Sequence, residues 1–175
     1  MLLLQHPREA RLAICSAWLA RIALVNAELH RGVSFAGNRR VTELAATPGA
    51  ALLYPGEGAA PAAALAGAPP SVLVVVDGTW LQADKMLAVN PLLAALPRVS
   101  AGSEEPSGYR DLRREPAPHC LSTIEAVACA LGALERDPGR FEPMRVAFRL
   151  MVEKQLACAR GERRSPRHRP GRGAA

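Results

Sequence analysis

The chain has 175 residues, of which 49% are hydrophobic, and this is enough for one domain with a buried core. No apolar run approaches the roughly 20 residues that cross a bilayer, and Met1–Leu4 lacks the basic flank of a signal peptide, so we expect a cytoplasmic protein. The four cysteines form no CxxC pair and no zinc-like spacing, so we expect neither a metal site nor a disulfide. The net charge is +6, and it is unevenly distributed along the chain.

Short apolar runs followed by turn residues predict strands in the first third of the chain. These strands cover residues 2–5, about 28–33 and 50–54. Apolar positions at helical spacing predict a helix over about residues 8–24. The alanine-rich stretch 58–68 fits either a weak helix or a loop, and the two prolines that follow end it.

The clearest element is the run Ser71–Val76, which contains Leu and Val with no polar alternation. Such a run is typical of a central strand in a parallel sheet that is covered on both faces. A helix is predicted over residues 80–89, where Asn90-Pro91 ends it. Residues 97–100 are predicted to form an edge strand.

The last third of the chain is predicted to be helical. Ser122-Thr-Ile-Glu125 has the pattern of a capping box and starts a helix that reaches about Arg136. A second helical stretch runs from Pro138 to about Arg160, and its Met and Phe positions are expected in the core. Because strands alternate with helices, the sequence predicts an α/β fold with a mainly parallel sheet and helices on both faces.

The positive charge is concentrated at the C-terminus. Residues 160–175 contain six arginines and one glutamate, which together supply +5 of the net charge. Arg, Pro and Gly cannot build a core, so we predict a folded domain over residues 1–159 and a disordered basic tail over 160–175. The tail either binds RNA phosphates without sequence preference or only keeps the protein in solution.

The segment Asp77-Gly78-Thr79-Trp80 follows the predicted central strand. Ligands of open α/β sheets bind beyond the carboxyl ends of the strands, which is where Asp77 would place its carboxylate. Gly78 would allow a ligand close to the backbone, and Thr79 would cap the next helix. The same four residues also fit an ordinary turn and helix start, so their spacing leaves both interpretations open.

A second candidate is the polar segment 107–116, which precedes a helix N-terminus. Its aromatic and basic residues are Tyr109, Arg110, Arg113 and Arg114. Guanidinium groups match the geometry of phosphate or carboxylate, so this segment can bind an anion. Asp111 and Glu115 can instead neutralise the arginines in a solvated surface network. Elsewhere the sequence has no P-loop, GxSxG, HExxH or GxGxxG pattern, which argues against the corresponding hydrolases and dinucleotide enzymes.

Taken in order, these pieces resemble the DTW-domain family, which is named for the Asp-x-Thr-Trp pattern found here at Asp77–Trp80. The resemblance covers roughly residues 2–158. It includes Leu4–Glu9, Leu52–Pro55, Lys85–Leu87, Asn90–Pro91, Leu96–Val99, Tyr109–Arg110, Leu112–Pro116 and Leu121–Ala126.

The resemblance implies a SPOUT-like fold that holds S-adenosyl-L-methionine (SAM) in loops at the strand ends. It implies transfer of the 3-amino-3-carboxypropyl group of SAM to N3 of a tRNA uridine, with release of 5′-methylthioadenosine. A homodimer is one arrangement that such folds adopt. A SPOUT-like RNA methyltransferase and a non-catalytic RNA-binding protein with a vestigial SAM pocket remain alternatives.

Within this resemblance, Asp77 is the expected catalytic residue. It would either accept the N3 proton or stabilise the sulfonium charge of SAM, and the sequence leaves both roles open. The residues expected to bind SAM are Leu53, Tyr54, Pro55, Gly78, Thr79, Trp80, Ser122 and Thr123. Those expected to bind RNA are Tyr109, Arg110, Arg113 and Arg114.

Overall fold

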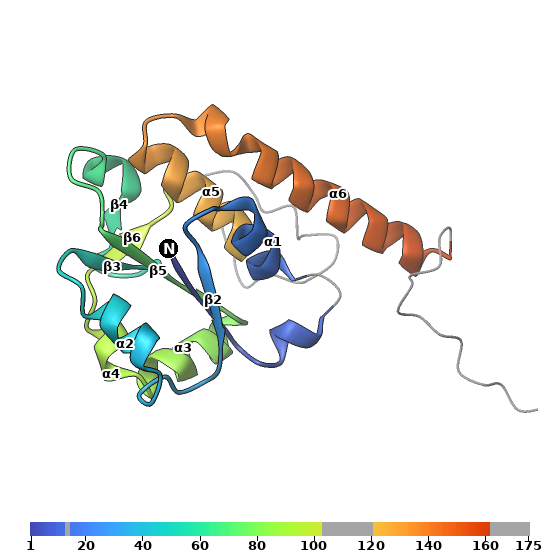
Figure 1. Cartoon of the computed structure of the whole chain (residues 1–175). Helices are drawn as coiled ribbons and strands as arrows, with labels where there is room; N and C mark the ends of the chain where they lie inside the picture. Colours follow the sequence, from blue (N-terminus) through green and yellow to red (C-terminus); the bar gives the residue numbers. More distant parts are fainter. Residues whose placement is uncertain (13–14, 103–120, 162–175) are drawn as a thin grey trace, which may run out of the picture.

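The computed structural model describes residues 1–12, 15–102 and 121–161. Its centre is a six-stranded sheet in which every pair of neighbouring strands is parallel (Figure 1). The strands are β1 (Leu2–Gln5), β2 (Glu28–Arg31), β3 (Ala50–Leu53), β4 (Ala60–Pro61), β5 (Val72–Asp77) and β6 (Arg98–Ser100). Their order across the sheet is β2-β1-β5-β3-β6-β4. The predicted α/β class with a parallel sheet is therefore confirmed.

Strand β5 lies between β1 and β3, as its apolar sequence predicts. All six of its residues are buried, and so are all four residues of β1. The register pairs Gln5 with both Arg31 and Asp77. These three residues therefore form one row across β2, β1 and β5, at the carboxyl ends of the strands.

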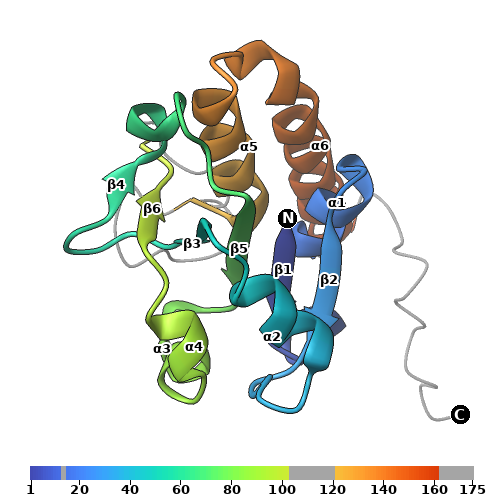
Figure 2. The ribbon, with the colours of Figure 1, turned by 60° about the vertical axis from the view of Figure 1, so that its left-hand side comes forward.

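Helices cover both faces of the sheet (Figures 1 and 2). The α-helices are α1 (Ser16–Ala23), α2 (Arg39–Ala45), α3 (Trp80–Ala88), α4 (Pro91–Ala94), α5 (Thr123–Leu134) and α6 (Glu142–Ala159). Short 3₁₀ turns are η1 (Glu9–Arg11), η2 (Ala62–Leu65) and η3 (Pro138–Phe141). One core lies between the sheet and α1, α5 and α6, and the other lies beneath α2, α3 and α4.

The connections that follow β1 and β5 leave on opposite faces of the sheet. Helix α1 follows β1 and packs beside α5, whereas α3 follows β5 and packs into the other core. Because β1 and β5 are neighbours, their carboxyl ends lie at a topological switch point, where open α/β sheets form a crevice for ligands. The predicted Asp77 site lies at this point.

The C-terminal helices agree with the sequence. Ser122 and Glu125 form the predicted capping box at the start of α5. The aromatic and Met positions of the following segment, including Phe141, Met144 and Phe148, are buried in the core under α5. The apolar stripe therefore lies in the core and packs α6 against α5 and α1.

The helix predicted over about residues 8–24 is confirmed only in its second half. Glu9–Arg11 forms a 3₁₀ turn, Leu12 has an extended backbone, and α1 begins only at Ser16. Two of the apolar residues behind the prediction, Leu12 and Ile22, are 46% and 59% exposed, whereas Leu19 packs half-buried against the core. The buried side of α1 consists of the small residues Ser16, Ala17 and Ala20, which let the helix approach its neighbours closely.

Two further differences concern the strands on the other side of the sheet. Strand β6 was predicted at the edge, but it lies between β3 and β4. The edge is formed instead by the two-residue strand β4, which belongs to the alanine-rich stretch and continues directly into η2. Helix α2, with Asn38 as its N-cap, was not predicted.

Part of the sequence analysis concerns residues outside the described ranges, including segment 107–116 and nearly all of the tail. Within the described ranges, no helix is long and apolar enough to cross a membrane. Cys15 and Cys158 are free thiols. In the same part of the chain, no group of three or more His, Cys, Asp or Glu side chains is placed to hold a metal ion.

Candidate active site

A buried polar cluster lies where β1 and β5 end. Asp77, the last residue of β5, is only 6% exposed, and Gln5, the last residue of β1, is fully buried. Nε2 of Gln5 donates a hydrogen bond to Oδ2 of Asp77 over 2.8 Å. The Thr123 hydroxyl donates to Oδ1 of Asp77 over 2.6 Å. Each oxygen of the carboxylate therefore accepts a hydrogen bond from a different segment of the chain.

The register of the sheet brings these residues together. Side chains two residues apart along a strand point to the same face, so Asp77 lies on the same side as Val75, and Gln5 on the same side as Leu3. Val75 and Leu3 belong to the core beneath α1 and α5. Asp77 and Gln5 therefore face the N-terminus of α5, where Thr123 is the first helical residue.

Gln5 connects the cluster to two further elements. Its amide Nε2 also donates to Sγ of Cys15, at 3.0 Å, in front of α1. Its Oε1 accepts from Nε of Arg31, at 3.3 Å, at the end of β2. The sequence analysis missed Gln5. The available signal was a polar residue that ends an otherwise apolar strand, as Asp77 does.

Two capping boxes fix the turns on either side of Asp77. Thr79 is the N-cap of α3, as predicted, and exchanges hydrogen bonds with Gln82. At α5, the Ser122 N–H and hydroxyl both donate to Oε2 of Glu125, at 2.9 and 2.6 Å. These backbone N–H groups of Thr79 and Ser122 thus hold the helix starts in place, and Glu125 acts as a cap.

Gly78 is required by close packing. A Cβ atom at this position would lie 3.1 Å from Cβ of Gln82 and 3.5 Å from Cβ of His6. The His6 N–H also donates to the carbonyl oxygen of Asp77 over 2.8 Å. A side chain at residue 78 would therefore press on the turn that positions the carboxylate, and glycine avoids this.

An aromatic pair lies on the other face of the same edge. The rings of Tyr54, after β3, and Trp80, in α3, meet edge to face with centroids 5.6 Å apart. The Tyr54 hydroxyl donates to Oδ1 of Asp84 over 2.7 Å, and the guanidinium of Arg98 lies 5.4 Å from the centre of the Tyr54 ring. Burial, and next the hydrogen bond to Asp84, raises the pKa of Tyr54, so the phenol is neutral at physiological pH. Asp84 and Arg98 were not predicted.

The remaining predicted residues are placed differently. The Leu53 side chain is buried in the core beneath α5, whereas Pro55 is exposed. Asp77 with Thr123, and Tyr54 with Trp80, form two groups on opposite faces of the strand ends. A ligand that contacts both groups would have to lie across the carboxyl edge of the sheet. Tyr109, Arg110, Arg113 and Arg114 lie outside the described residues.

Comparison with known proteins identifies the family of the chain. The model of the DTW domain matches residues 1–156. The chain is 32% identical to tRNA-uridine aminocarboxypropyltransferase 2 of Drosophila melanogaster over 144 residues, which is 79% of this chain and 57% of the relative. It is 29% identical to tRNA-uridine aminocarboxypropyltransferase A of Arabidopsis thaliana, in an alignment that covers 81% of this chain and 65% of the relative.

A third relative is tRNA-uridine aminocarboxypropyltransferase 2 of Macaca fascicularis, which is 29% identical over 142 residues, or 77% of this chain and 47% of the relative. The chain therefore spans about half to two thirds of the length of these relatives. No solved structure matches it. Because the domain match covers nearly the whole described fold, including the Asp77 turn and α5, the chain belongs to the DTW-domain family.

Proposed function

We propose that this protein transfers the 3-amino-3-carboxypropyl group of SAM to N3 of a uridine in tRNA and releases 5′-methylthioadenosine. Membership of the DTW-domain family and the names of three relatives support the proposal. The structural observation that carries it is the buried carboxylate of Asp77, held at the switch point by Gln5 and Thr123.

In the proposed reaction, N3 of uridine attacks the γ-methylene carbon of the SAM methionine moiety. A bond forms between N3 and this carbon, and the bond from the carbon to sulfur breaks with its electron pair going to sulfur. The sulfonium thereby becomes the neutral thioether of 5′-methylthioadenosine, and N3 loses its proton. Because a protonated N3 is a poor nucleophile, a carboxylate in reach of that proton accelerates the step.

Asp77 is the residue we assign to this proton. Its carboxylate is the end of a buried central strand, and hydrogen bonds to both oxygens fix its orientation. A base held this firmly is in position before the substrates arrive, and positioning alone contributes several kcal/mol to such reactions. Alternatively, the same charge stabilises the sulfonium of bound SAM, which would make Asp77 a binding residue.

The aromatic pair supports a place for the donor. Trp80 is half-buried and offers apolar ring surface next to the turn that contains Asp77, and the buried Tyr54 ring packs against it. We assign the adenosine part of SAM to this side and its methionine part to the Asp77 side, across the carboxyl edge of the sheet. The target uridine would have to leave its stack to reach this point. A relationship to the SPOUT class is part of the same proposal.

The experiment incubates the protein with SAM and an unmodified tRNA transcript and then analyses nucleosides and small products by mass spectrometry. We expect aminocarboxypropyl-uridine and 5′-methylthioadenosine in equal amounts. A methylated nucleoside with S-adenosylhomocysteine would contradict the proposal and identify a methyltransferase.

Asp77→Asn separates the two roles of the carboxylate, since it preserves shape and removes the charge. If Asp77 is the base, the variant loses transfer by at least 100-fold but binds SAM as the wild type does. If Asp77 stabilises the sulfonium, SAM binding measured by calorimetry weakens as well. Asp137→Asn is the matched control, because Asp137 is exposed and caps η3 away from the strand ends. Normal transfer by Asp77→Asn would remove Asp77 from the mechanism.

A further inference from the structure

A shallow hollow of about 480 Å³ lies at the free edge of strand β2. It is lined by Trp18, Arg21, Leu29, His30, Arg31 and Asn38. These residues come from the outer side of α1, from β2 and from the N-cap of α2. The hollow therefore combines one large aromatic ring with two guanidinium groups on an open surface.

Among the described residues, Trp18 is the one aromatic side chain in the set of exposed large hydrophobic residues. The buried side of α1 is formed by small residues, and Trp18 lies away from it with 50% of its surface exposed. Large aromatic surface in contact with water is costly when nothing covers it. A flat indole beside positive charge is the arrangement on which proteins stack bases of single-stranded nucleic acid, because every base has a flat face.

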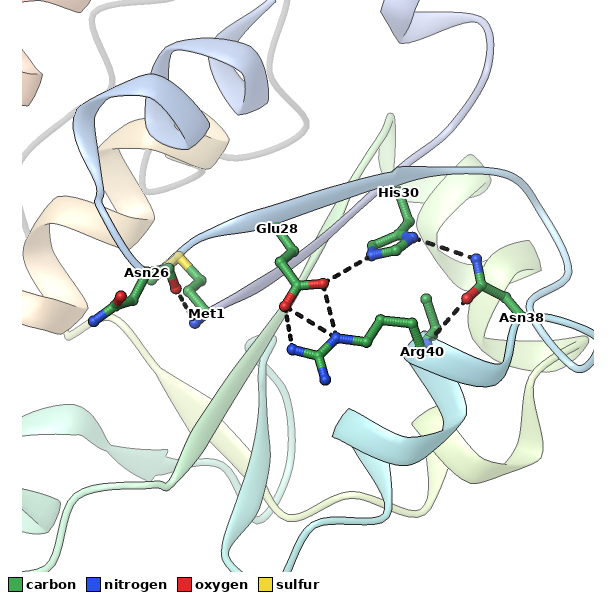
Figure 3. Close-up of polar contacts among 7 residues, drawn as sticks. Met1, Asn26, Glu28, His30, Asn38 and Arg40 are labelled. Atoms are coloured by element: carbon green, nitrogen blue, oxygen red, sulfur yellow. Dashed lines mark hydrogen bonds and ion pairs between the residues drawn. The ribbon is translucent and has the colours of Figure 1, made fainter.

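The positive charge of the hollow is available for an anion. Among the described residues, no carboxylate forms an ion pair with Arg21 or Arg31. The acid closest in sequence on β2 is Glu28, and its carboxylate is bound by Arg40 at 2.5 Å (Figure 3).

The same carboxylate contacts His30, whose other ring nitrogen lies 3.3 Å from Asn38 (Figure 3). This network fixes the wall of the hollow formed by His30 and Asn38. It also occupies Glu28, so that Arg21 and Arg31 can contact phosphate groups.

The hollow is connected to the candidate active site. Nε of Arg31 donates to Oε1 of Gln5, and Nε2 of Gln5 donates to Asp77. Arg31, Gln5 and Asp77 occupy neighbouring positions in the row across β2, β1 and β5. The Cα atoms of Arg31 and Asp77 are therefore two strand spacings apart, which is about 10 Å. An RNA strand with one nucleotide at Asp77 would therefore pass over this hollow with a neighbouring nucleotide.

From these observations we infer that the hollow is a subsite for a nucleotide next to the target uridine, with its base stacked on Trp18 and its phosphate bound by Arg21 and Arg31. The inference rests on the proposed function for the identity of the RNA. Its physical reason is that a uridine taken out of its stack leaves a neighbour without a stacking partner, and Trp18 replaces that partner.

The test measures binding of a fluorescently labelled, unmodified tRNA transcript to the full chain. Trp18→Ala should weaken binding by roughly 5- to 150-fold, which is the contribution of stacking one base. Arg21→Ala should weaken binding and lower the slope of log affinity against log salt by about 0.7–0.9. The matched controls on α6 are Leu150→Ala, since Leu150 is also 50% exposed, and Lys154→Ala.

Tryptophan fluorescence tests the stacking directly. The chain contains two tryptophans, so Trp80→Phe leaves Trp18 as the sole reporter. Addition of oligouridylate should quench this emission, and the quenching should saturate. Unchanged emission at saturating RNA would overturn the inference.

The outcomes also separate this inference from the proposed function. If the wild type modifies tRNA, and Trp18→Ala and Arg21→Ala bind it like the controls, the subsite is wrong and the activity stands. If the wild type binds tRNA through Trp18 but forms no aminocarboxypropyl-uridine, the subsite stands and the activity is wrong. Circular dichroism of each variant establishes that the fold is intact, and SAM binding adds a second check for the Trp18 and Arg21 variants.

Discussion

The hydrogen bond from Thr123 to Asp77 allows a sharp test of how the carboxylate is held. The hydroxyl lies 2.6 Å from Oδ1 of Asp77, at the first residue of α5. Thr123→Val removes the donor and keeps the branched shape, and Val and Thr have similar helix propensities. Loss of a hydrogen bond to a charged group should lower the free energy of unfolding by about 1.5–3 kcal/mol.

Thr123→Ser is the matched control, because it keeps the hydroxyl and removes one methyl group. Thr123 is only half-buried, so the methyl contributes less than about 0.8 kcal/mol. Urea denaturation followed by circular dichroism measures both variants, and an unchanged m-value would show that the unfolded state is unaffected. If the Val and Ser variants unfold with equal free energies, the hydroxyl does not anchor Asp77 and our account of the cluster fails.

Two further predictions concern stability. Gly132→Ala would place a Cβ atom 2.9 Å from Cα of Pro138, so the free energy of unfolding in urea should fall by about 1–3 kcal/mol. In an exposed helix the same substitution would raise it by about 1 kcal/mol. Gly37→Ala is the control, because a Cβ atom there meets no atom within 4 Å and should not destabilise the fold. The hydrogen bond from Arg40 lowers the pKa of Glu28 from 4.5 to about 2, so this pair stabilises the fold above pH 4.5 and loses its effect as pH falls towards 2. Because both side chains are partly exposed, Arg40→Ala should lower the free energy of unfolding only slightly at pH 7 and by less at pH 2. An effect of the same size at both pH values would contradict this.

The sequence predicted the centre of the sheet well and the first helix poorly, because β5 is buried through large apolar residues and α1 mainly through small ones. The strand Val72–Asp77 is covered on both faces, so its apolar run is continuous and gives a clear signal of a central strand. Helix α1 packs through Ser16, Ala17 and Ala20, while larger residues such as Ile22 face outwards. A pattern that follows large apolar residues therefore identifies the wrong side of this helix.

The candidate site was predictable only in part. Asp77 could be found because it follows the central strand directly. Its partner Gln5 is 72 residues away, and the pairing depends on the register between β1 and β5, which the sequence does not reveal. Arg98 was missed for a similar reason, since its position over Tyr54 depends on β6 lying next to β3 inside the sheet.

The way in which Asp77 is held has a consequence for biosynthesis. Its carboxylate contacts residues 5 and 123, so its nearest partners are far apart along the chain. Contacts of such high sequence separation form late, after the intervening chain has been ordered. A nascent chain that has left the ribosome only as far as β6 can pair its strands, but the carboxylate gains its hydroxyl partner only when α5 emerges and docks. Formation of the polar cluster around Asp77 is thereby coupled to completion of the domain.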